Sequence, residues 1–488
     1  MAMSTRPRGP SNARRQTACP DCRHWQRQAR QAERRVQRLS RDNDKLRERV
    51  RTLEEQLEQA QRSAKRQAAP FSRGRPKGKP RRPGRRRGAA YGPRARRPVP
   101  DHVDETVEVP LPCGCPDCGG DVELDRIADQ YQTEIPPVRP HVTRFRVHLG
   151  HCRRCYKKLR GRHPRQVSQA LGAAAPHLGP RAVALAADLN KRLGLSYGKV
   201  VALFQAAFGL TVSRGGVCQA LARLARAAEP TYRGLIERVR GSPVVAPDET
   251  GWKVGGRLNW LWVFVSAEVT VYAIQPGRGF DQAAAILSAE FSGVLERDGW
   301  APYRRFEQAE HQTCLDHLLR RCRHLLDWAE RGQARFPHAV RRVLLAALDL
   351  RERFAAGQLS PHGLAVARGR LAARMDRTLT GRITHPPNLR FARHLSREQP
   401  YLFTFLGRDD VAATNHRAEQ AIRPAVVTRK VWGGNRTWAG AHTQQILASV
   451  LRTCHQQGRD PLGLFALMLH WQRPPNLAPM MLNPTGRH

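Results

Sequence analysis

Apolar residues recur with a seven-residue period near the beginning of the chain. From Ala29 to Ala64 the a and d positions carry alanine, valine or leucine, with a single asparagine, Asn43, at an a position. Valine at a with leucine at d favours two parallel strands, and one buried asparagine fixes their register. The pattern predicts a dimeric coiled coil over residues 29–66, with a homodimer formed through residues 29–64. A lone amphipathic helix packed on the rest of the protein is the alternative.

The residues on either side of these heptads carry different patterns. The tail of residues 1–28 contains Cys19 and Cys22, which either bind a metal together with a partner chain or form a simple turn.

Residues 67–100 are rich in glycine and proline, and the part from 71 to 98 has twelve Arg or Lys residues and no acid. Such a segment cannot bury a core, so we expect a disordered basic linker that contacts DNA phosphates. A solvated linker without a partner is the alternative.

Two further Cys-x-x-Cys pairs frame a predicted zinc-ribbon domain over residues 101–165. The pairs are Cys115 with Cys118 and Cys152 with Cys155. Each pair places two thiolates on one tight turn, and two such turns complete a tetrahedral Zn²⁺ site. Four protein ligands leave no open position, so we expect this zinc to be structural.

Between these pairs, apolar and polar residues alternate as they do in short strands. The alternation covers residues 131–135 and 145–149, which predicts two strands between the cysteine turns. Cys113 and His151 are additional candidate ligands.

Apolar side chains recur at helical spacing within residues 166–240, which predicts a helical module. We expect this module to bind DNA, for the following reason. Phe208 is followed by a glycine turn and by Ser213, which is expected to cap a second helix. This order has the outline of a helix-turn-helix. Arg214, Arg223 and Arg226 fit this interpretation and its alternative equally well. A small helical bundle of another kind is the alternative.

A β-β-β-α-β order follows, and two of its strands lead to an aspartate. The apolar residues 244–246 predict a buried strand that stops at Pro247, so that Asp248 lies at its end. Residues 293–297 predict a fourth strand, which ends on Asp298. The order suits a ribonuclease-H-like sheet, in which the first and fourth strands are neighbours and the two aspartates would meet. The intervening elements are predicted at residues 260–266, 269–274 and 281–290.

Glu419 supplies a third acid from a predicted helix. Asn415 is placed to cap this helix, Glu419 lies one turn into it, and Pro424 is expected to kink or end it. Between the second and third acids, residues 310–317 predict a fifth strand, and an Arg-rich stretch up to about Arg377 predicts helices. The three acids therefore come from segments far apart in the sequence.

Three carboxylates are the ligands that two divalent cations require for an in-line displacement at phosphorus. One ion activates water or a 3′-hydroxyl, and the other stabilises the leaving oxygen. We therefore expect Mg²⁺, or Mn²⁺, at Asp248, Asp298 and Glu419. Glu249 is an alternative ligand to Asp248.

Four motifs stand in this half of the chain: Asp248-Glu-Thr, Asp298-Gly-Trp-Ala-Pro-Tyr, Cys314-x-x-His317 and Asn415-x-x-x-Glu419-x-x-Ile-Arg-Pro-x-x-x-x-Arg429-Lys430. Together they resemble the DDE transposases of the insertion-sequence-66 family. The predicted coiled coil, cysteine pairs and helical stretch follow the order of that family, so the resemblance covers nearly the whole chain. His416 stands where a second asparagine is expected, which affects only the local helix cap.

The resemblance implies a multidomain α+β protein. Its catalytic domain would be ribonuclease-H-like over residues 241–435, with a helical insertion at about 318–400, and residues 436–488 would form a C-terminal helix and tail. The resemblance also implies Mg²⁺-dependent cleavage of element ends and strand transfer into target DNA. It assigns the three acids as metal ligands.

Basic residues near Glu419 are candidate DNA contacts. Arg423, Arg429 and Lys430 suit phosphate groups, with an ordinary basic helix face as the alternative. His317 is a further candidate, although His317 and Cys314 also fit a buried helix start.

Charge and cysteine content agree with a nucleic-acid partner in a reducing compartment. Lys and Arg outnumber Asp and Glu by 84 to 41, a net charge of +43, which favours polyanions. No apolar run reaches the roughly 18 residues of a membrane span, and the first residues lack the apolar core of a secretory signal. The eleven cysteines, several of them in pairs, favour metal over disulfides. We expect a cytoplasmic, nucleoid-associated protein.

The combined prediction is a dimeric, metal-dependent DNA transposase. Its expected partners are the terminal inverted repeats of the element, target DNA and accessory proteins of the element. One alternative is a catalytically inactive DNA-binding regulator derived from a transposase. Another is a structure-selective nuclease without strand transfer.

Overall fold

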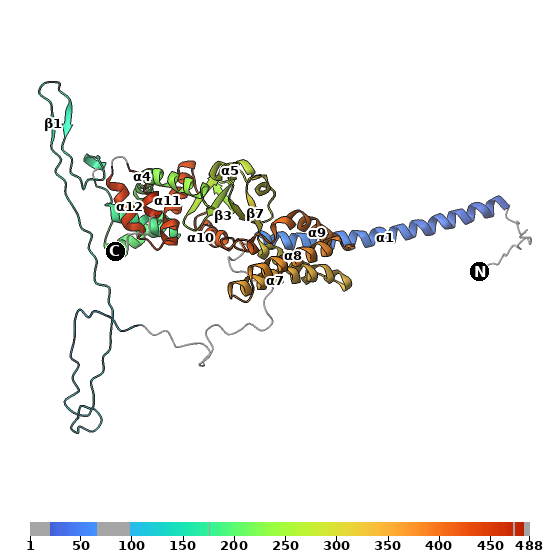
Figure 1. Cartoon of the computed structure of the whole chain (residues 1–488), viewed down its shortest axis with the longest axis horizontal. Helices are drawn as coiled ribbons and strands as arrows, with labels where there is room; N and C mark the ends of the chain where they lie inside the picture. The colour runs from blue at the N-terminus through green and yellow to red at the C-terminus, as the bar shows by residue number, and fades with distance from the viewer. Residues whose placement is uncertain (1–19, 66–97, 175, 472–473, 483–488) are drawn as a thin grey trace, which may run out of the picture. The chain divides into compact units, whose positions relative to one another are not determined.

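The computed structural model describes residues 20–65, 98–174, 176–471 and 474–482. The chain divides into two units, Met1–Ala95 and Arg96–His488. The described part of the first is helix α1 (Pro20–Lys65), which carries the predicted heptads (Figure 1). The heptad residues Val36, Leu39, Leu46, Val50 and Leu53 are exposed in the single chain, and the predicted dimer stays a prediction. Cys19, residue 66 of the predicted coiled coil and residues 67–97 of the predicted basic linker lie outside the described residues.

The second unit begins with the predicted zinc-ribbon region, which has little regular structure. Its described strands are β1 (Leu149–His151) and β2 (Lys158–Arg160), which pair antiparallel. The strand predicted at residues 131–135 is absent, and only Leu149 of the other predicted run belongs to a strand. The apolar side chains of these runs are largely exposed, so they lack a surface on which to pack as strands.

Helices follow where the apolar spacing predicts them. They are α2 (Pro180–Ala187), a π-helical turn (Asp188–Arg192), α3 (Tyr197–Phe208) and α4 (Arg214–Arg240). Helix α3 ends at Gly209, whose φ of 63° is left-handed and therefore suits glycine. Helix α4 is capped by Ser213, whose hydroxyl accepts a hydrogen bond from the backbone N–H of Gly216. The two helices and their turn have the predicted outline, and their contact with DNA stays a prediction.

A mixed five-stranded sheet lies at the centre of this unit, in the order β5-β4-β3-β6-β7 (Figure 1). Its elements are β3 (Val244–Val254), β4 (Arg257–Val265), β5 (Thr270–Gln275), helix α5 (Phe280–Leu287), β6 (Val294–Arg297) and β7 (Glu310–Thr313). Strands β3, β4 and β5 are antiparallel, whereas β6 is parallel to β3 and to β7. The predicted adjacency of the first and fourth strands is confirmed.

Strand β3 is longer than predicted. It does not stop at Pro247 but continues through Asp248 to Val254. Strand β6 pairs with β3 only at Val244 and Val245, so Pro247 interrupts no ladder on that side. The proline is therefore compatible with the strand.

The two faces of the sheet are covered by different helices. Val245, Trp262 and Leu295 belong to a core that includes α4, α5 and α11. Ala246 and Val263, one position further along their strands, belong to a second core with α10. This alternation follows from the two-residue period of a strand.

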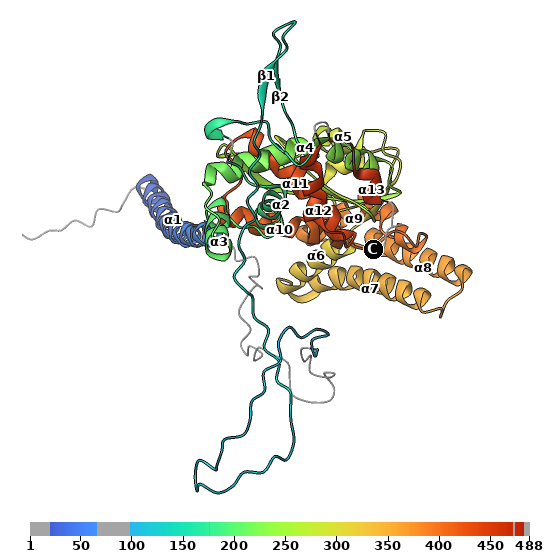
Figure 2. The ribbon, with the colours of Figure 1, turned by 90° about the vertical axis from the view of Figure 1, so that its left-hand side faces the viewer.

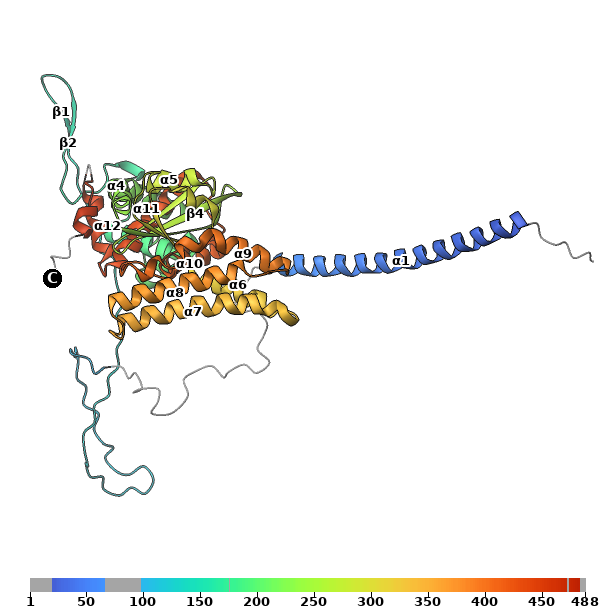
Figure 3. The same ribbon diagram turned by 45° about the vertical axis from the view of Figure 1, so that its right-hand side comes forward.

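A helical insertion separates β7 from α10. Its helices are α6 (Leu315–Asp327), α7 (Arg335–Ala355), α8 (Pro361–Thr380) and α9 (Pro386–Glu398), with 3₁₀ turns at Arg331–Ala334, Gln399–Tyr401 and Thr404–Leu406. Helices α7 and α8 lie side by side in both Figure 2 and Figure 3. The insertion has its own apolar core, which reaches the sheet through Val244 and Val294.

The remaining helices are α10 (His416–Trp432), α11 (Trp438–Gln456), α12 (Pro461–His470) and α13 (Ala478–Leu482). Pro424 was expected to kink or end its helix. It lies inside α10 and does not end it. Residues 436–488 were expected to form one helix and a tail, and their described part contains the three helices α11, α12 and α13. Among the described helices, none is both long enough and apolar enough to cross a membrane.

Candidate active site

Asp248 lies in β3, and Asp298 comes directly after β6, the strand next to β3 in the sheet. Strands β3 and β6 run parallel with Val245 opposite Leu295. This pairing ends at Val245 and Leu295, and each aspartate follows three residues later on its own segment. Asp298 follows directly after Arg297, the last residue of β6.

The carboxylate of Asp248 is partly buried and lies among other acids. Burial and the carboxylates of Glu249, Asp298 and Glu419 raise the pKa of Asp248 to about 7, against the lowering effect of a backbone hydrogen bond. That bond is donated by the N–H of Glu249 to Oδ1 of Asp248, at 2.9 Å. The structure therefore brings the three predicted acids into one electrostatic neighbourhood.

The motif around Asp298 orients this carboxylate. Its Oδ1 accepts a hydrogen bond of 2.9 Å from the backbone N–H of Trp300. A Cβ at Gly299, which stands between them, would lie 2.4 Å from the ring of His394 on α9, so a larger residue here would displace that ring. The Asp-Gly-Trp sequence thus lets the helical insertion approach while the tryptophan N–H fixes the acid.

Glu419 is held by basic side chains of α6. Its Oε1 lies 2.5 Å from Nη2 of Arg320 and 3.6 Å from Nε2 of His317. His317, predicted as a DNA contact, therefore lies against the third acid. Cys314 of the same motif is buried, as the alternative interpretation expected.

Glu249, the alternative ligand, is engaged by two other side chains. Its carboxylate lies 2.6 Å from Nη2 of Arg278 and accepts a hydrogen bond from the hydroxyl of Tyr303. The Arg278 guanidinium lies over the rings of Trp260 and Trp300, at 4.9 and 4.0 Å. Because Glu249 is only 2 % exposed and bound in this way, Asp248 is the better placed of the two to bind a ligand.

The three acids offer the oxygen donors that Mg²⁺ and Mn²⁺ prefer. Their mutual repulsion, which contributes to the raised pKa of Asp248, is what a bound cation would relieve. In the described ranges, however, no three His, Cys, Asp or Glu side chains are grouped closely enough to hold an ion as they stand. The donor chemistry fits a divalent cation, while the side chain of Glu419 is turned to Arg320.

The predicted zinc ligands form two turns of the same type. Gly119 and Tyr156 donate their backbone N–H to the carbonyls of Cys115 and Cys152, and both have positive φ. Backbone hydrogen bonds within each turn lower the pKa of the Cys115 and Cys152 thiols, which favours the thiolate that Zn²⁺ binds. The structure does not bring the two turns together into one four-sulfur site among the described residues. The zinc site accordingly stays a prediction.

The predicted DNA contacts on α10 differ in their surroundings. Arg429 is partly buried, and its Nη1 donates to Thr250 Oγ1 at 3.1 Å and to the carbonyl of Gly251, so it ties α10 to β3. Arg423 is exposed, and Lys430 is half-buried. The phosphate contacts of all three stay predictions.

Several residues of this site escaped the sequence analysis. Arg320 follows His317 by one helical turn, so extending the Cys314-x-x-His317 motif by three residues would have found it. Arg278 lies in the loop after β5 and carries no motif of its own.

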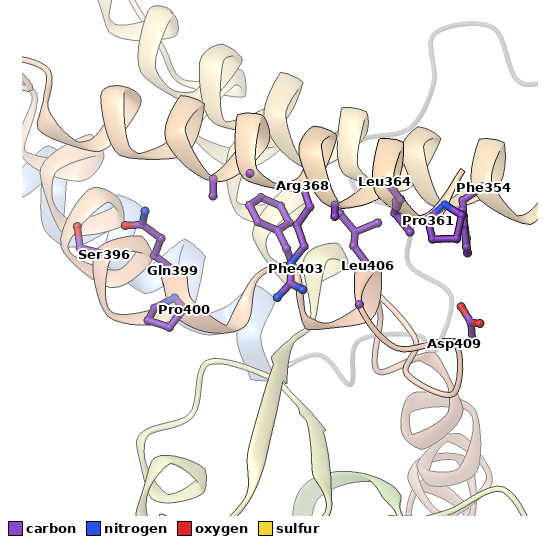
Figure 4. A pocket seen from close by; sticks show the side chains of 14 residues that line it. Phe354, Pro361, Leu364, Arg368, Ser396, Gln399, Pro400, Phe403, Leu406 and Asp409 are labelled. Carbon is purple, nitrogen blue, oxygen red and sulfur yellow. The ribbon is translucent and has the colours of Figure 1, made fainter. Parts of the chain in front are cut away.

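A cavity of about 710 Å³ lies in the helical insertion, away from the acids (Figure 4). It is lined by apolar side chains such as Leu364 and Phe403, with Arg368 and Asp409 at its polar positions. None of the three acids lines it.

The comparisons with known proteins identify a family for the part of the chain that contains this site. The family model described as Transposase IS66 family matches residues 177–443, which include the sheet and all three acids. A protein of Sinorhizobium fredii, described as uncharacterized protein y4qI, is 27 % identical over 414 residues, which are 76 % of this chain and 73 % of that protein.

Proposed function

This chain belongs to the IS66 family of transposases, and we propose on that premise that it cleaves the ends of an insertion element and joins them to target DNA. The observation that carries the proposal is the meeting of three acids from distant segments. Asp298 and Glu419 both contribute to the raised pKa of Asp248. Such convergence supports a DDE-type site on a ribonuclease-H-like core, since β3 and β6 are parallel neighbours.

Each side chain of the candidate site has its own proposed role. Asp248, Asp298 and Glu419 would hold Mg²⁺ or Mn²⁺, which supplies charge stabilisation and an activated oxygen nucleophile when bound. The N–H of Trp300 keeps one Asp298 oxygen in place, so that carboxylate is preorganised. Arg278 and Tyr303 keep Glu249 away from this role. Arg320 neutralises the Glu419 carboxylate until that carboxylate binds the cation.

DNA binding is supported by charge. The net charge of +43 creates a strong attraction for phosphates, and IS66 membership makes DNA the natural polyanion. We assign the element ends to the helical module and the basic linker, with dimerisation through α1 and a structural Zn²⁺ at the four paired cysteines. We also propose that the protein acts with accessory proteins of the element and that it is associated with the nucleoid.

One observation favours the inactive DNA-binding regulator as a second candidate. Glu419 forms an ion pair with Arg320, and the described acids do not stand ready around a cation. A regulator would keep this ion pair permanently, whereas a transposase would open it.

Substitution of Asp298 by asparagine separates the two candidates. The test uses the full chain and a plasmid that carries the gene with its native flanking DNA, with Mg²⁺ present. Loss of strand cleavage with DNA binding retained supports the transposase. No metal-dependent cleavage by the unmodified protein, with DNA binding intact, supports the regulator. Joined products from pre-cut ends distinguish a transposase from a nuclease.

A further inference from the structure

The start of α10 is bound to the strand that carries the first acid. Asn415 donates from Nδ2 to the carbonyl oxygen of Pro247, at 2.8 Å. Asn415 is only 2 % exposed, so water does not compete for this bond. Pro247 immediately precedes Asp248. One buried hydrogen bond therefore connects the N-terminus of α10 to the residue before Asp248.

This bond replaces the helix-capping role expected of Asn415, which makes no side-chain cap. The carbonyl of Pro247 lies in the part of β3 that β6 no longer pairs with, where a backbone acceptor needs another donor. The side chain of Asn415 supplies it. The backbone N–H of Asn415 also donates to Sγ of Cys314, at 3.2 Å.

A second buried contact binds α10 to the strand that carries Asp298. Glu296, 1 % exposed at its side chain, accepts hydrogen bonds from Nη2 of Arg417 at 3.0 and 3.1 Å. It also accepts one from the N–H of Ala412, at 2.6 Å. Glu296 stands two residues before Asp298, and Arg417 stands two residues before Glu419.

The helix transmits both contacts to Glu419. The N–H of Glu419 donates to the carbonyl of Asn415 at 3.1 Å, in the first turn of α10. A shift of Asn415 therefore moves the backbone of Glu419 with it. Because the backbone is fixed at both strands, only the side chain of Glu419 has to turn when it leaves Arg320.

We propose that Asn415 and Glu296 are positioning residues that set the place of Glu419 relative to Asp248 and Asp298. This inference rests on the proposed transposase function and deepens it. Neither residue touches the reacting groups; each acts through the backbone beside an acid. Groups that orient metal ligands in this way commonly change metal affinity by about 10- to 100-fold when they are replaced.

The chain offers a matched control for Asn415. Asn388 in α9 is 3 % exposed and donates from Nδ2 to the carbonyl of Gln333, also at 2.8 Å. Asn415→Leu and Asn388→Leu each delete one buried bond of the same kind and add the same bulk with the same branching. Only the first bond lies beside the acids.

The experiment titrates the full-length variants with MnCl₂ by calorimetry, and measures their melting temperature, plasmid binding and strand cleavage. We expect both leucine variants to lose similar thermal stability and to bind DNA. Asn415→Leu alone should lower the Mn²⁺ affinity about 10-fold or more and reduce cleavage in parallel. Equal Mn²⁺ affinity and cleavage in the two variants would overturn the inference.

Glu296→Gln keeps the test decisive if Asn415→Leu does not fold. The amide still accepts from Ala412 but loses its charge partner Arg417, so Mn²⁺ affinity should fall while the fold is kept. Unchanged affinity in this variant would also overturn the inference.

The Asp298→Asn variant separates failure of the proposed function from failure of this inference. If Asp298→Asn retains cleavage, the proposed function itself is wrong. If Asp298→Asn abolishes cleavage and the positioning variants behave like Asn388→Leu, only the positioning role is wrong.

Discussion

Arg297 and Glu398 form a fully buried ion pair, with Nη1 and Oε2 2.5 Å apart and neither side chain exposed to solvent. Arg297 ends β6 and Glu398 ends α9, so the pair joins the sheet to the helical insertion. Nη1 of Arg297 also donates to the carbonyl of Asp298, at 3.0 Å. The insertion thereby contributes to the position of the second acid.

Removal of one partner of this pair should be strongly destabilising. Glu398→Gln leaves the Arg297 charge buried without a counter-charge, which typically costs about 3–5 kcal/mol. Arg297→Met combined with Glu398→Leu removes both charges and should cost clearly less. Urea unfolding of the two variants measures the difference. Equal losses would mean that the charge itself is unimportant there.

His311 should make the protein acid-sensitive. Burial, followed by the charge of Arg297, lowers the pKa of His311 to about 4, against about 6.5 in an unfolded chain. Between these values the unfolded chain takes up a proton that the folded chain does not. Stability should therefore fall by about 3 kcal/mol as the pH drops from 6.5 to 4. In His311→Gln, which can still donate to the Phe306 carbonyl, this part of the pH dependence should disappear; an unchanged slope would assign it to other groups.

Arg320 should compete with a cation for Glu419. Its guanidinium is about half exposed, so Arg320→Gln should change the free energy of unfolding by no more than about 1 kcal/mol. Mn²⁺ affinity should rise, because the positive charge at the Glu419 carboxylate is gone. Arg323→Gln, on an exposed position of the same helix, is the control. Weaker Mn²⁺ binding by Arg320→Gln would show that Arg320 orients Glu419 for the metal and does not oppose binding.

The exposed heptad residues of α1 should be a dimer interface. Leu46 and Leu53 occupy d positions and are more than half exposed in the single chain. Replacing both by aspartate should convert the dimer into a monomer in light scattering at micromolar concentration. Gln37→Asp, at an outward b position, should leave the dimer intact. A monomeric unmodified protein would contradict the predicted coiled coil.

Local sequence patterns predicted the elements of the site well. The alternating strands, the capped α4 and the aspartates that follow apolar residues of β3 and β6 all depend on neighbours in the chain, and the adjacency of β3 and β6 followed from the strand order. The role of Asn415 could not be predicted in this way, because its partner Pro247 lies far away in the sequence and a helix cap was the nearest local explanation. The pairing of Arg320 with Glu419 also joins residues far apart in the sequence, although Glu419 itself was predicted.

Context also explains where the pattern was misleading. Pro247 indicated a strand end, yet β3 continues because β6 has already separated from it at that point. The apolar alternation at residues 131–135 indicated a strand, yet those side chains are largely exposed. Sequence alone shows neither the presence nor the absence of such a neighbour.

The central claim is that three acids from distant segments act as one metal site. Calorimetric titration of the full chain with MnCl₂ tests it most directly, using Asp248→Asn, Asp298→Asn, Glu419→Gln and their pairwise combinations. We predict that each single substitution removes the same binding event, and that a second substitution removes little more. Losses that simply add, or Mn²⁺ binding that survives all three substitutions, would contradict the claim.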